Sequence, residues 1–238
     1  MSERKLCFKA IVGSYNYNLQ TPDSDKDYKI FFYPNFDDLY KGGHYSKAFV
    51  GDDEDIEYHD IRKLPNLLYK SNVNFMEVLF SEEYEVYDKD LFSKLISLRE
   101  EIARMNIPYL YDACIGMYMR KMKDYYRDKE KEQVAKTNKH AMSSYRILDF
   151  LERFHSHSFH SFKHSIQYDL MDPRREFLLE VRSGKYSFEQ LEEMIANKER
   201  HIQSIKEHYK SVEVNKKLKV TLDSVIKTSV KTAVFETF

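Results

Sequence analysis

The sequence from residue 11 to residue 31 reads IVGSYNYNLQTPDSDKDYKIF. An apolar run ends at Gly13 and Ser14, a turn-rich segment follows, and Asp25 and Asp27 then open a second apolar run. Runs rich in Ile, Val, Phe and Tyr are typical of strands, so we expect both runs to lie in a β-sheet. Successive strand side chains alternate between the faces of a sheet, which places Asp25 and Asp27 on one face near the start of the second strand.

Gly13, Ser14, Asp25 and Asp27 are together suited to bind a metal ion and the phosphates of a nucleotide. Two neighbouring carboxylates can bind a hard divalent cation such as Mg²⁺ (or Mn²⁺), which keeps positions open for water and substrate phosphates. Gly13 has no Cβ and lets a phosphate approach the backbone, and Ser14 offers a hydroxyl and an amide N–H. A Gly-Ser turn and an Asp-x-Asp turn are each common in surface loops, so it is their combination that predicts a triphosphate site.

The composition of the whole chain excludes several classes of protein. The 238 residues include 38 Lys+Arg and 39 Asp+Glu, and a net charge of −1 argues against a protein that coats nucleic acid through a general basic surface. Mean hydropathy is −0.66 and no run of about 20 apolar residues occurs, so we expect no membrane-spanning segment. The start of the chain lacks the long apolar segment of a signal peptide, and Cys7 and Cys114 are too few for a disulfide framework. We therefore expect a cytoplasmic protein with two reduced, buried thiols.

The character of the sequence changes near residue 88. Before it, the pattern predicts strands at 5–12, 28–33 and 55–61, and a helix that begins near Pro65. Beyond it the helical period predominates, with helices expected at 91–102, 111–122, 141–154, 188–209 and 214–235. Ser187 and Gln190 fit a capping box that opens a helix after a turn at Gly184. The pattern as a whole predicts an α+β protein.

The segment from Gly13 to Asp27 resembles the nucleotidyltransferases of the DNA polymerase beta superfamily, which share an apolar-Gly-Ser, spacer, Asp-x-Asp pattern. Its second half, Thr21-Pro22-Asp23-Ser24-Asp25-Lys26-Asp27, is similar to the branch related to the RNA-ligase-associated nucleotidyltransferases. The resemblance spans roughly residues 8 to 210. Further similar segments lie at 58–64, 72–74, 77–80, 139–141 with Arg146, and 178–186.

The resemblance implies a fold and an activity. The fold would be a small mixed sheet of the polymerase-beta type, backed by helices, in a catalytic domain over residues 1–87, followed by an all-helical domain over 88–238 that closes the cleft. The activity would be metal-dependent transfer of a nucleoside monophosphate from an NTP such as ATP to an acceptor hydroxyl, with pyrophosphate leaving and RNA as the expected acceptor. Asp25 and Asp27 would hold the metal ions. The nucleotide would be bound by Gly13, Ser14, Tyr17, Lys139, His140 and Arg146.

Relatives carry a third carboxylate on the strand before the helix near Pro65, and three residues compete for that role. Asp55 and Glu57 share a face, whereas Asp60 points the other way in a regular strand. Asp60 also fits a turn or a helix entry. The family spacing favours Asp55, which would complete the metal set, with Glu57 second, and we keep both as candidate catalytic residues.

Two alternative functions stay open at this point. One is a catalytically inactive nucleotide-binding module, and the other transfers the nucleotide to a protein hydroxyl, as some members of the wider superfamily do in toxin–antitoxin pairs. If RNA is the acceptor, the net charge requires a local basic patch, and Tyr15 or Tyr17 could stack on a base. The candidate basic residues are Lys121, Lys123, Lys136, Lys139 and Arg146.

Overall fold

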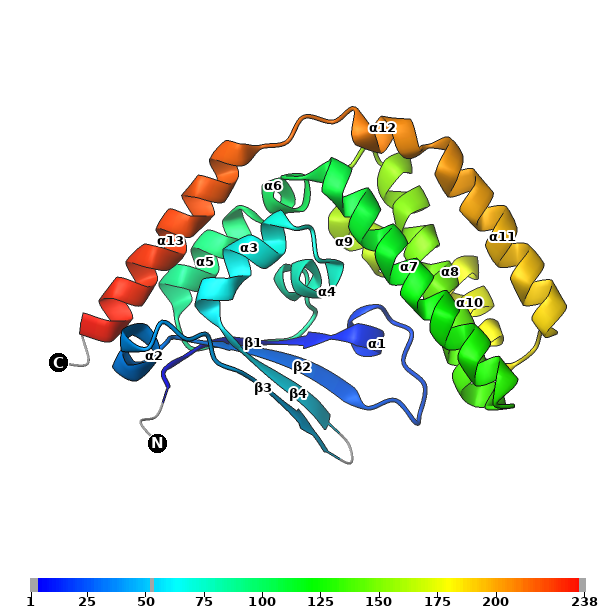
Figure 1. Ribbon diagram of the computed structural model, residues 1–238, viewed down its shortest axis with the longest axis horizontal. Helices are drawn as coiled ribbons and strands as arrows, with labels where there is room; N and C mark the ends of the chain where they lie inside the picture. Colours follow the sequence, from blue (N-terminus) through cyan, green and yellow to red (C-terminus); the bar gives the residue numbers. More distant parts are fainter. Residues whose placement is uncertain (1–3, 52–53, 236–238) are drawn as a thin grey trace. The chain divides into compact units, whose positions relative to one another are not determined.

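The computed structural model describes residues 4–51 and 54–235 (Figure 1). Residues 1–3, part of the start that was compared with a signal peptide, lie outside the described residues, as do residues 52 and 53. The chain forms two compact units, one from residues 4–106 and 214–235 and the other from residues 107–213. The first unit contains the sheet, and the second consists of packed helices.

The first unit contains a five-stranded mixed sheet, as the sequence predicts. Its strands are β1 (Leu6–Val12), β2 (Lys26–Phe32), β3 (Ser46–Val50), β4 (Glu54–Asp60) and β5 (Tyr84–Val86), in the order β3-β4-β2-β1-β5. β2 and β4 run parallel, and the other neighbouring strands are antiparallel. The pattern did not predict β3 or β5, because all five residues of β3 are exposed and β5 has only 3 residues.

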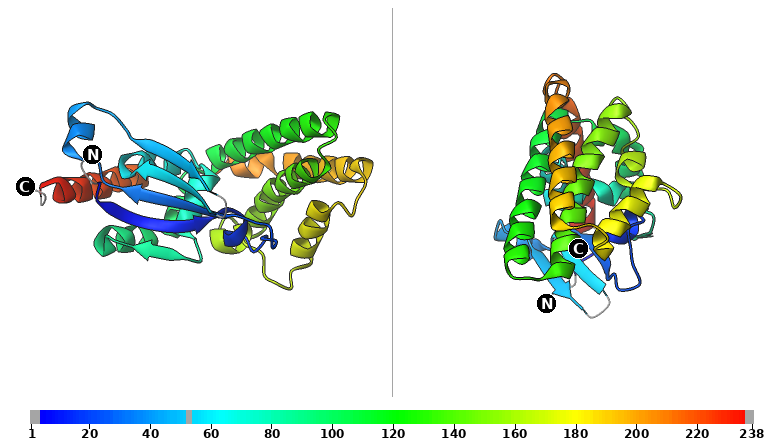
Figure 2. Two further views of the ribbon diagram at one scale, coloured as in Figure 1. Left: turned by 90° about the horizontal axis from the view of Figure 1, so that it is seen from below. Right: turned by 90° about the vertical axis from the view of Figure 1, so that its right-hand side faces the viewer.

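Helices cover one face of this sheet. Phe8 of β1 and Phe31 of β2 stack at 4.8 Å, Phe92 lies 5.5 Å from Phe8, and Phe75 lies 6.4 Å from Phe31, measured between ring centroids. Phe75 and Phe92 belong to α4 (Val73–Met76) and α5 (Lys89–Ser97), and we call this the helix-covered face. The opposite face, which carries Tyr58, has no described helix in front of it in the left view of Figure 2. We call it the open face.

The helices of the first unit are mostly short. The sequence predicted the start of one near Pro65, and Pro65 indeed lies in the first turn of α3. The predicted helix at 91–102 is divided at Leu98 into α5 and α6. The full set is α1 (Gly13–Asn16), α2 (Phe36–Tyr40), η1 (Ile61–Lys63), α3 (Leu64–Tyr69), α4 (Val73–Met76), η2 (Glu77–Leu79), α5 (Lys89–Ser97), α6 (Arg99–Ala103) and α13 (Lys216–Phe235).

The division of the chain differs from the expected boundary after residue 87. Residues 88–106 belong to the first unit, since α5 packs on β1 and buries Leu91 and Leu95 completely. The last helix, α13, also returns to the first unit, where it contacts α3 and α5 and buries Leu222. Helical periodicity shows which face of a helix is apolar, but it does not show which part of the chain covers that face.

The second unit is entirely helical among its described residues. Its helices are α7 (Ile107–Glu130), α8 (Val134–Ser156), α9 (Phe162–Ile166), α10 (Pro173–Ser183), α11 (Phe188–Ser204) and α12 (Lys206–Lys210). The predicted capping box of Ser187 and Gln190 opens α11, and Gly184 ends α10 with a φ of +83°. Phe150, Phe154 and Phe162 form an aromatic core between α8 and α9.

Two further predictions can be compared with the structure. Cys7 and Cys114 are unpaired and buried, as expected, and burial raises the pKa of the Cys114 thiol to about 12. Within the described residues, none of the helices combines the length and the apolar character needed to cross a bilayer.

Candidate active site

The turn after β1 brings a glycine against the second aspartate of the Asp-x-Asp pair. Val12 pairs with Asp27 across β1 and β2, and the chain then turns at Gly13 with a φ of +69°. A Cβ on Gly13 would lie 2.4 Å from Asp27 Oδ2, closer than real Cβ atoms come. Both the positive φ and this close approach require glycine here. The backbone at Gly13 therefore lies directly beside the Asp27 carboxylate.

A buried glutamate from another part of the chain holds this turn in place. The Gly13 N–H donates a hydrogen bond to Glu77 Oε2 at 3.1 Å, and the Asn16 side-chain amide donates to the same oxygen at 3.4 Å. Glu77 is 2% exposed and Asn16 is fully buried. The Gly13 N–H already donates to Glu77, so it is not available to a phosphate. Ser14 is available, because its hydroxyl has no hydrogen-bond partner in the described part of the chain.

Asp27 and Asp55 occupy paired positions on neighbouring parallel strands. The register pairs Asp27 of β2 with Asp55 of β4, and both side chains lie on the helix-covered face near the beginnings of their strands. Both residues are half-buried. The structure thus places Asp27, one of the two aspartates predicted to bind metal, next to Asp55, the favoured third carboxylate.

Asp25 lies outside this pair. It precedes β2, is exposed, and lines a polar pocket of about 390 Å³ together with Tyr15, Lys26 and Glu54. No group of three or more His, Cys, Asp and Glu side chains suited to a metal ion occurs in residues 4–51 and 54–235. The donor set nevertheless fits a hard cation, since Asp27 and Asp55 offer carboxylate oxygens and the phosphates of a bound nucleotide supply more.

Glu57, the second candidate for the third carboxylate, already has two partners. It pairs with Lys29 on β2, and its Oε2 lies 3.0 Å from His59 Nε2 on its own strand. The hydrogen bond with His59, together with the hydrogen bond from Lys29 and its positive charge, lowers the pKa of Glu57 to about 2. A carboxylate held between two such groups has little capacity left for a metal ion, which favours Asp55 over Glu57.

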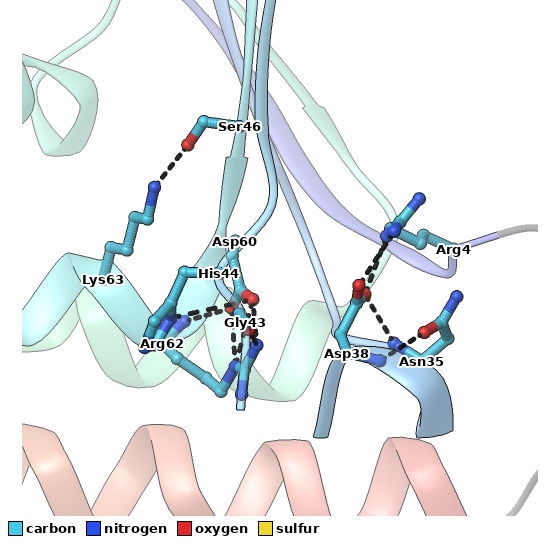
Figure 3. Close-up of polar contacts among 9 residues, drawn as sticks. All are labelled: Arg4, Asn35, Asp38, Gly43, His44, Ser46, Asp60, Arg62 and Lys63. Atoms are coloured by element: carbon cyan, nitrogen blue, oxygen red, sulfur yellow. Dashed lines mark hydrogen bonds and ion pairs between the residues drawn. The ribbon is translucent and has the colours of Figure 1, made fainter. Parts of the chain in front are cut away.

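Asp60 has a structural role (Figure 3). Its side chain is fully buried and accepts hydrogen bonds from the Arg62 backbone N–H at 2.9 Å and from Arg62 Nε at 3.0 Å. The same arginine donates to the Gly43 carbonyl, so Asp60 and Arg62 attach the loop before β3 to the start of η1. The alternation of the strand places Asp60 on the other face from Asp55, as expected.

The two tyrosines of the loop after Gly13 differ in accessibility. Tyr17 is only 5% exposed, whereas Tyr15 is half-exposed and lines the pocket that contains Asp25. The Lys26 ammonium lies 5.8 Å from the centre of the Tyr15 ring. Of the two, Tyr15 is therefore the side chain that a nucleotide base can reach.

Residues 1–227 match a family model described as RlaP, RNA repair pathway DNA polymerase beta family. The chain belongs to this family. Membership in the RlaP family confirms the resemblance drawn from the Gly-Ser and Asp-x-Asp pattern, and it identifies a polymerase-beta-type nucleotidyltransferase family related to RNA repair. No curated protein matches the chain.

The RlaP-family match extends through the second unit, where three predicted nucleotide-binding residues lie on α8. Lys139 is exposed, and Lys139 and Arg146 both add their positive charge to the surroundings of Lys121 on α7. Burial, with a smaller contribution from these cations, lowers the pKa of Lys121. The structure therefore gathers a basic cluster of Lys121, Lys139 and Arg146 within this unit.

His140 lies beside this basic cluster. Its Nε2 is 3.2 Å from Asp128 Oδ2, and its buried Nδ1 has no hydrogen-bond partner among the described residues. Burial, followed by the nearby Lys121 charge, lowers the pKa of the imidazole, so His140 is neutral at neutral pH. Of the predicted α8 residues, Lys139 and Arg146 therefore carry the charge and His140 offers a neutral ring.

Glu77 is a residue of the candidate site to which the sequence pattern assigned no role. It stands as a single charged residue in the run Met76-Glu77-Val78-Leu79-Phe80, and a carboxylate buried in such a run needs hydrogen-bond donors. That signal was present in the sequence. Its partner could not be identified, because Gly13 is 64 residues away along the chain.

Proposed function

We propose that this protein transfers a nucleoside monophosphate from an NTP to an acceptor hydroxyl of RNA, with pyrophosphate as the leaving group. The observation that carries the proposal is the contact between the Gly13 turn and Asp27, with Asp55 paired beside Asp27. Family membership supports the RNA-repair context.

In this proposal, the side chains near the Gly13 turn bind the metal ion, the phosphates and the base of the NTP. Asp27 and Asp55, with Asp25 from the adjacent loop, would hold Mg²⁺ or Mn²⁺, which supplies charge stabilisation to phosphates when bound. Ser14 donates a hydrogen bond to a terminal phosphate oxygen of the NTP. Tyr15 stacks on the base, and Asp55 accepts the proton of the attacking hydroxyl.

The test is a transfer assay on the full chain with each α-labelled NTP, Mg²⁺ or Mn²⁺, and separate RNA, tRNA and protein acceptors. Wild-type protein is expected to label RNA, and Asp27→Asn and Asp55→Asn are each expected to abolish the labelling. Asp90→Asn is the matched control, since Asp90 is an exposed aspartate on α5 that pairs only with Lys94 four residues away among described residues. Labelling of the protein acceptor alone would replace RNA by protein as the acceptor, and equal activity of Asp27→Asn would refute the proposed site.

A further inference from the structure

The open face of the sheet in the first unit carries a hollow of about 320 Å³ beside β3. Its walls include Lys47 and Phe49 of the edge strand β3, and Tyr58 of β4. Tyr45, the residue before β3, also lines it. The register pairs Lys47 with Tyr58, and these residues alternate with Asp55 and Glu57 along the strands. The hollow therefore lies on the face opposite to Asp27 and Asp55.

Two of the aromatic rings that line this hollow are unusually exposed. Phe49 is 54% exposed and Tyr45 is 36% exposed, although large apolar side chains on a strand normally pack against a neighbour. Exposed rings on a sheet surface present flat π-faces, and unpaired nucleobases stack on such rings with little dependence on sequence. Inside a duplex the base faces are covered by the neighbouring pairs, so a duplex would gain little from such rings.

The charged side chains that line the hollow are Arg4 and Lys47, and no described carboxylate lines it. The Arg4 guanidinium lies 4.1 Å from the centre of the Tyr45 ring and is held by Asp38 through hydrogen bonds of 2.8 and 2.9 Å (Figure 3). Asp38 thus positions Arg4 and offsets its charge. Lys47 forms no ion pair with a described residue, so its charge is available to a phosphate.

We propose that this hollow binds an unpaired stretch of an RNA strand, with a base stacked on Phe49 and Tyr45 and the adjoining phosphate on Lys47. A volume of about 320 Å³ suits one or two nucleotides. The choice of RNA rests on the proposed function, but the binding itself does not require transfer. Lys47, a cation without an ion pair among the described residues, also fits a protein with a net charge of −1, which must hold nucleic acid through local contacts.

The test is fluorescence anisotropy of a labelled, unstructured oligoribonucleotide with the full chain, in EDTA and without NTP. Phe49→Ala is expected to weaken binding about fivefold or more, the usual effect of losing one stacked base. Lys47→Ala is expected to reduce the slope of log affinity against log salt by about 0.7, the loss of one phosphate contact. Tyr40→Ala and Lys41→Ala are the matched controls, because both side chains are exposed on or next to α2 and do not line the hollow.

Three outcomes would overturn the inference: wild-type protein that does not bind the oligoribonucleotide, binding that Phe49→Ala leaves unchanged, or equal affinity for a blunt RNA duplex. Circular dichroism on each variant shows whether it has folded. We expect both hollow variants to fold, because Phe49 and Lys47 are exposed. Failure of the proposed function gives a different result, since RNA would then still bind through Phe49 while no NTP produced labelled product.

Discussion

At the scale of single residues, Gly13 is the position with the least freedom to change. Its positive φ and its contact with Asp27 both depend on the missing Cβ. Glu77 adds a third constraint by accepting its N–H. This concentration of constraints at one turn is typical of a backbone positioned for a ligand rather than of a simple connection between strands.

We expect Gly13→Val to lose NTP binding, because its side chain would displace the Asp27 carboxylate. Strain at the positive φ would also destabilise the fold by about 1–3 kcal/mol. Ser14→Ala should weaken NTP binding by only about tenfold, the effect of one hydrogen bond to a charged group, and leave the fold unchanged. Calorimetric titration with magnesium and NTP, alongside urea unfolding, separates these effects. An NTP affinity that is unaffected in Gly13→Val would show that this turn does not bind phosphate.

Glu57 predicts a dependence of stability on pH. Its pKa is lowered from 4.5 to about 2 in the folded protein, so the unfolded chain binds the proton more tightly. The stabilising contribution is therefore fully present above about pH 4.5 and is lost as the pH falls towards 2. Urea unfolding from pH 5 to pH 2 should show a smaller loss of stability in Glu57→Gln than in wild-type protein. Parallel curves for the two proteins would contradict the ion pair with Lys29 and His59.

At the scale of elements, the parallel pairing of β2 with β4 is what gives Asp27 and Asp55 a common site. Strand alternation predicted the shared face of Asp55 and Glu57 and the opposite direction of Asp60. It did not predict that Asp25 precedes the strand, because the end of a strand depends on backbone pairing as well as on residue type. It also could not identify the Glu57 partners, since Lys29 comes from a strand whose register is set by the whole sheet.

Asp60→Asn and Asp55→Asn, both on β4, should affect different properties: the first the stability of the fold, the second nucleotide transfer. Asp60→Asn removes the charge of a buried partner of Arg62, so we expect a loss of about 3–5 kcal/mol in the free energy of unfolding. The folded fraction should keep its nucleotide transfer. Asp55→Asn should show the reverse, with unchanged unfolding and no transfer. Chemical denaturation and transfer assays on both variants check this, and a stable, inactive Asp60→Asn protein would reassign the third carboxylate.

At the scale of the whole molecule, the sequence predicted an α+β protein and located its longer helices α7, α8, α11 and α13, but it missed α9 and α10. It also did not predict which helices join which unit. The apolar faces of α5 and α13 have the same period as those of α7 and α8. Only the packing shows that the first pair belongs with the sheet. The expected division at residue 87 therefore followed the change in local pattern, whereas the compact units follow contacts between distant segments.

The return of α13 to the first unit can be tested within that helix. Leu222→Ala should lower the free energy of unfolding by about 2–5 kcal/mol, since Leu222 is fully buried. Val220→Ala on the same helix should have almost no effect, because Val220 is 68% exposed. Hydrogen exchange in Leu222→Ala should show lost protection in α3 and α5 and unchanged protection in α8. Lost protection in α8 instead would place α13 with the second unit.

Because the first unit is discontinuous in sequence, synthesis on the ribosome completes the two units in the reverse of their order along the chain. The Asn215 N–H donates to the Met105 carbonyl at 2.8 Å, so the chain leaves the first unit and re-enters it at one place. All residues of the second unit have been made when residue 213 is added, while α13 is still missing. Until α13 emerges, the apolar sides of α3 and α5 that it covers stay open to water. The nascent protein can therefore assemble its helical unit first, and the turn at Gly13 belongs to the unit that is finished last.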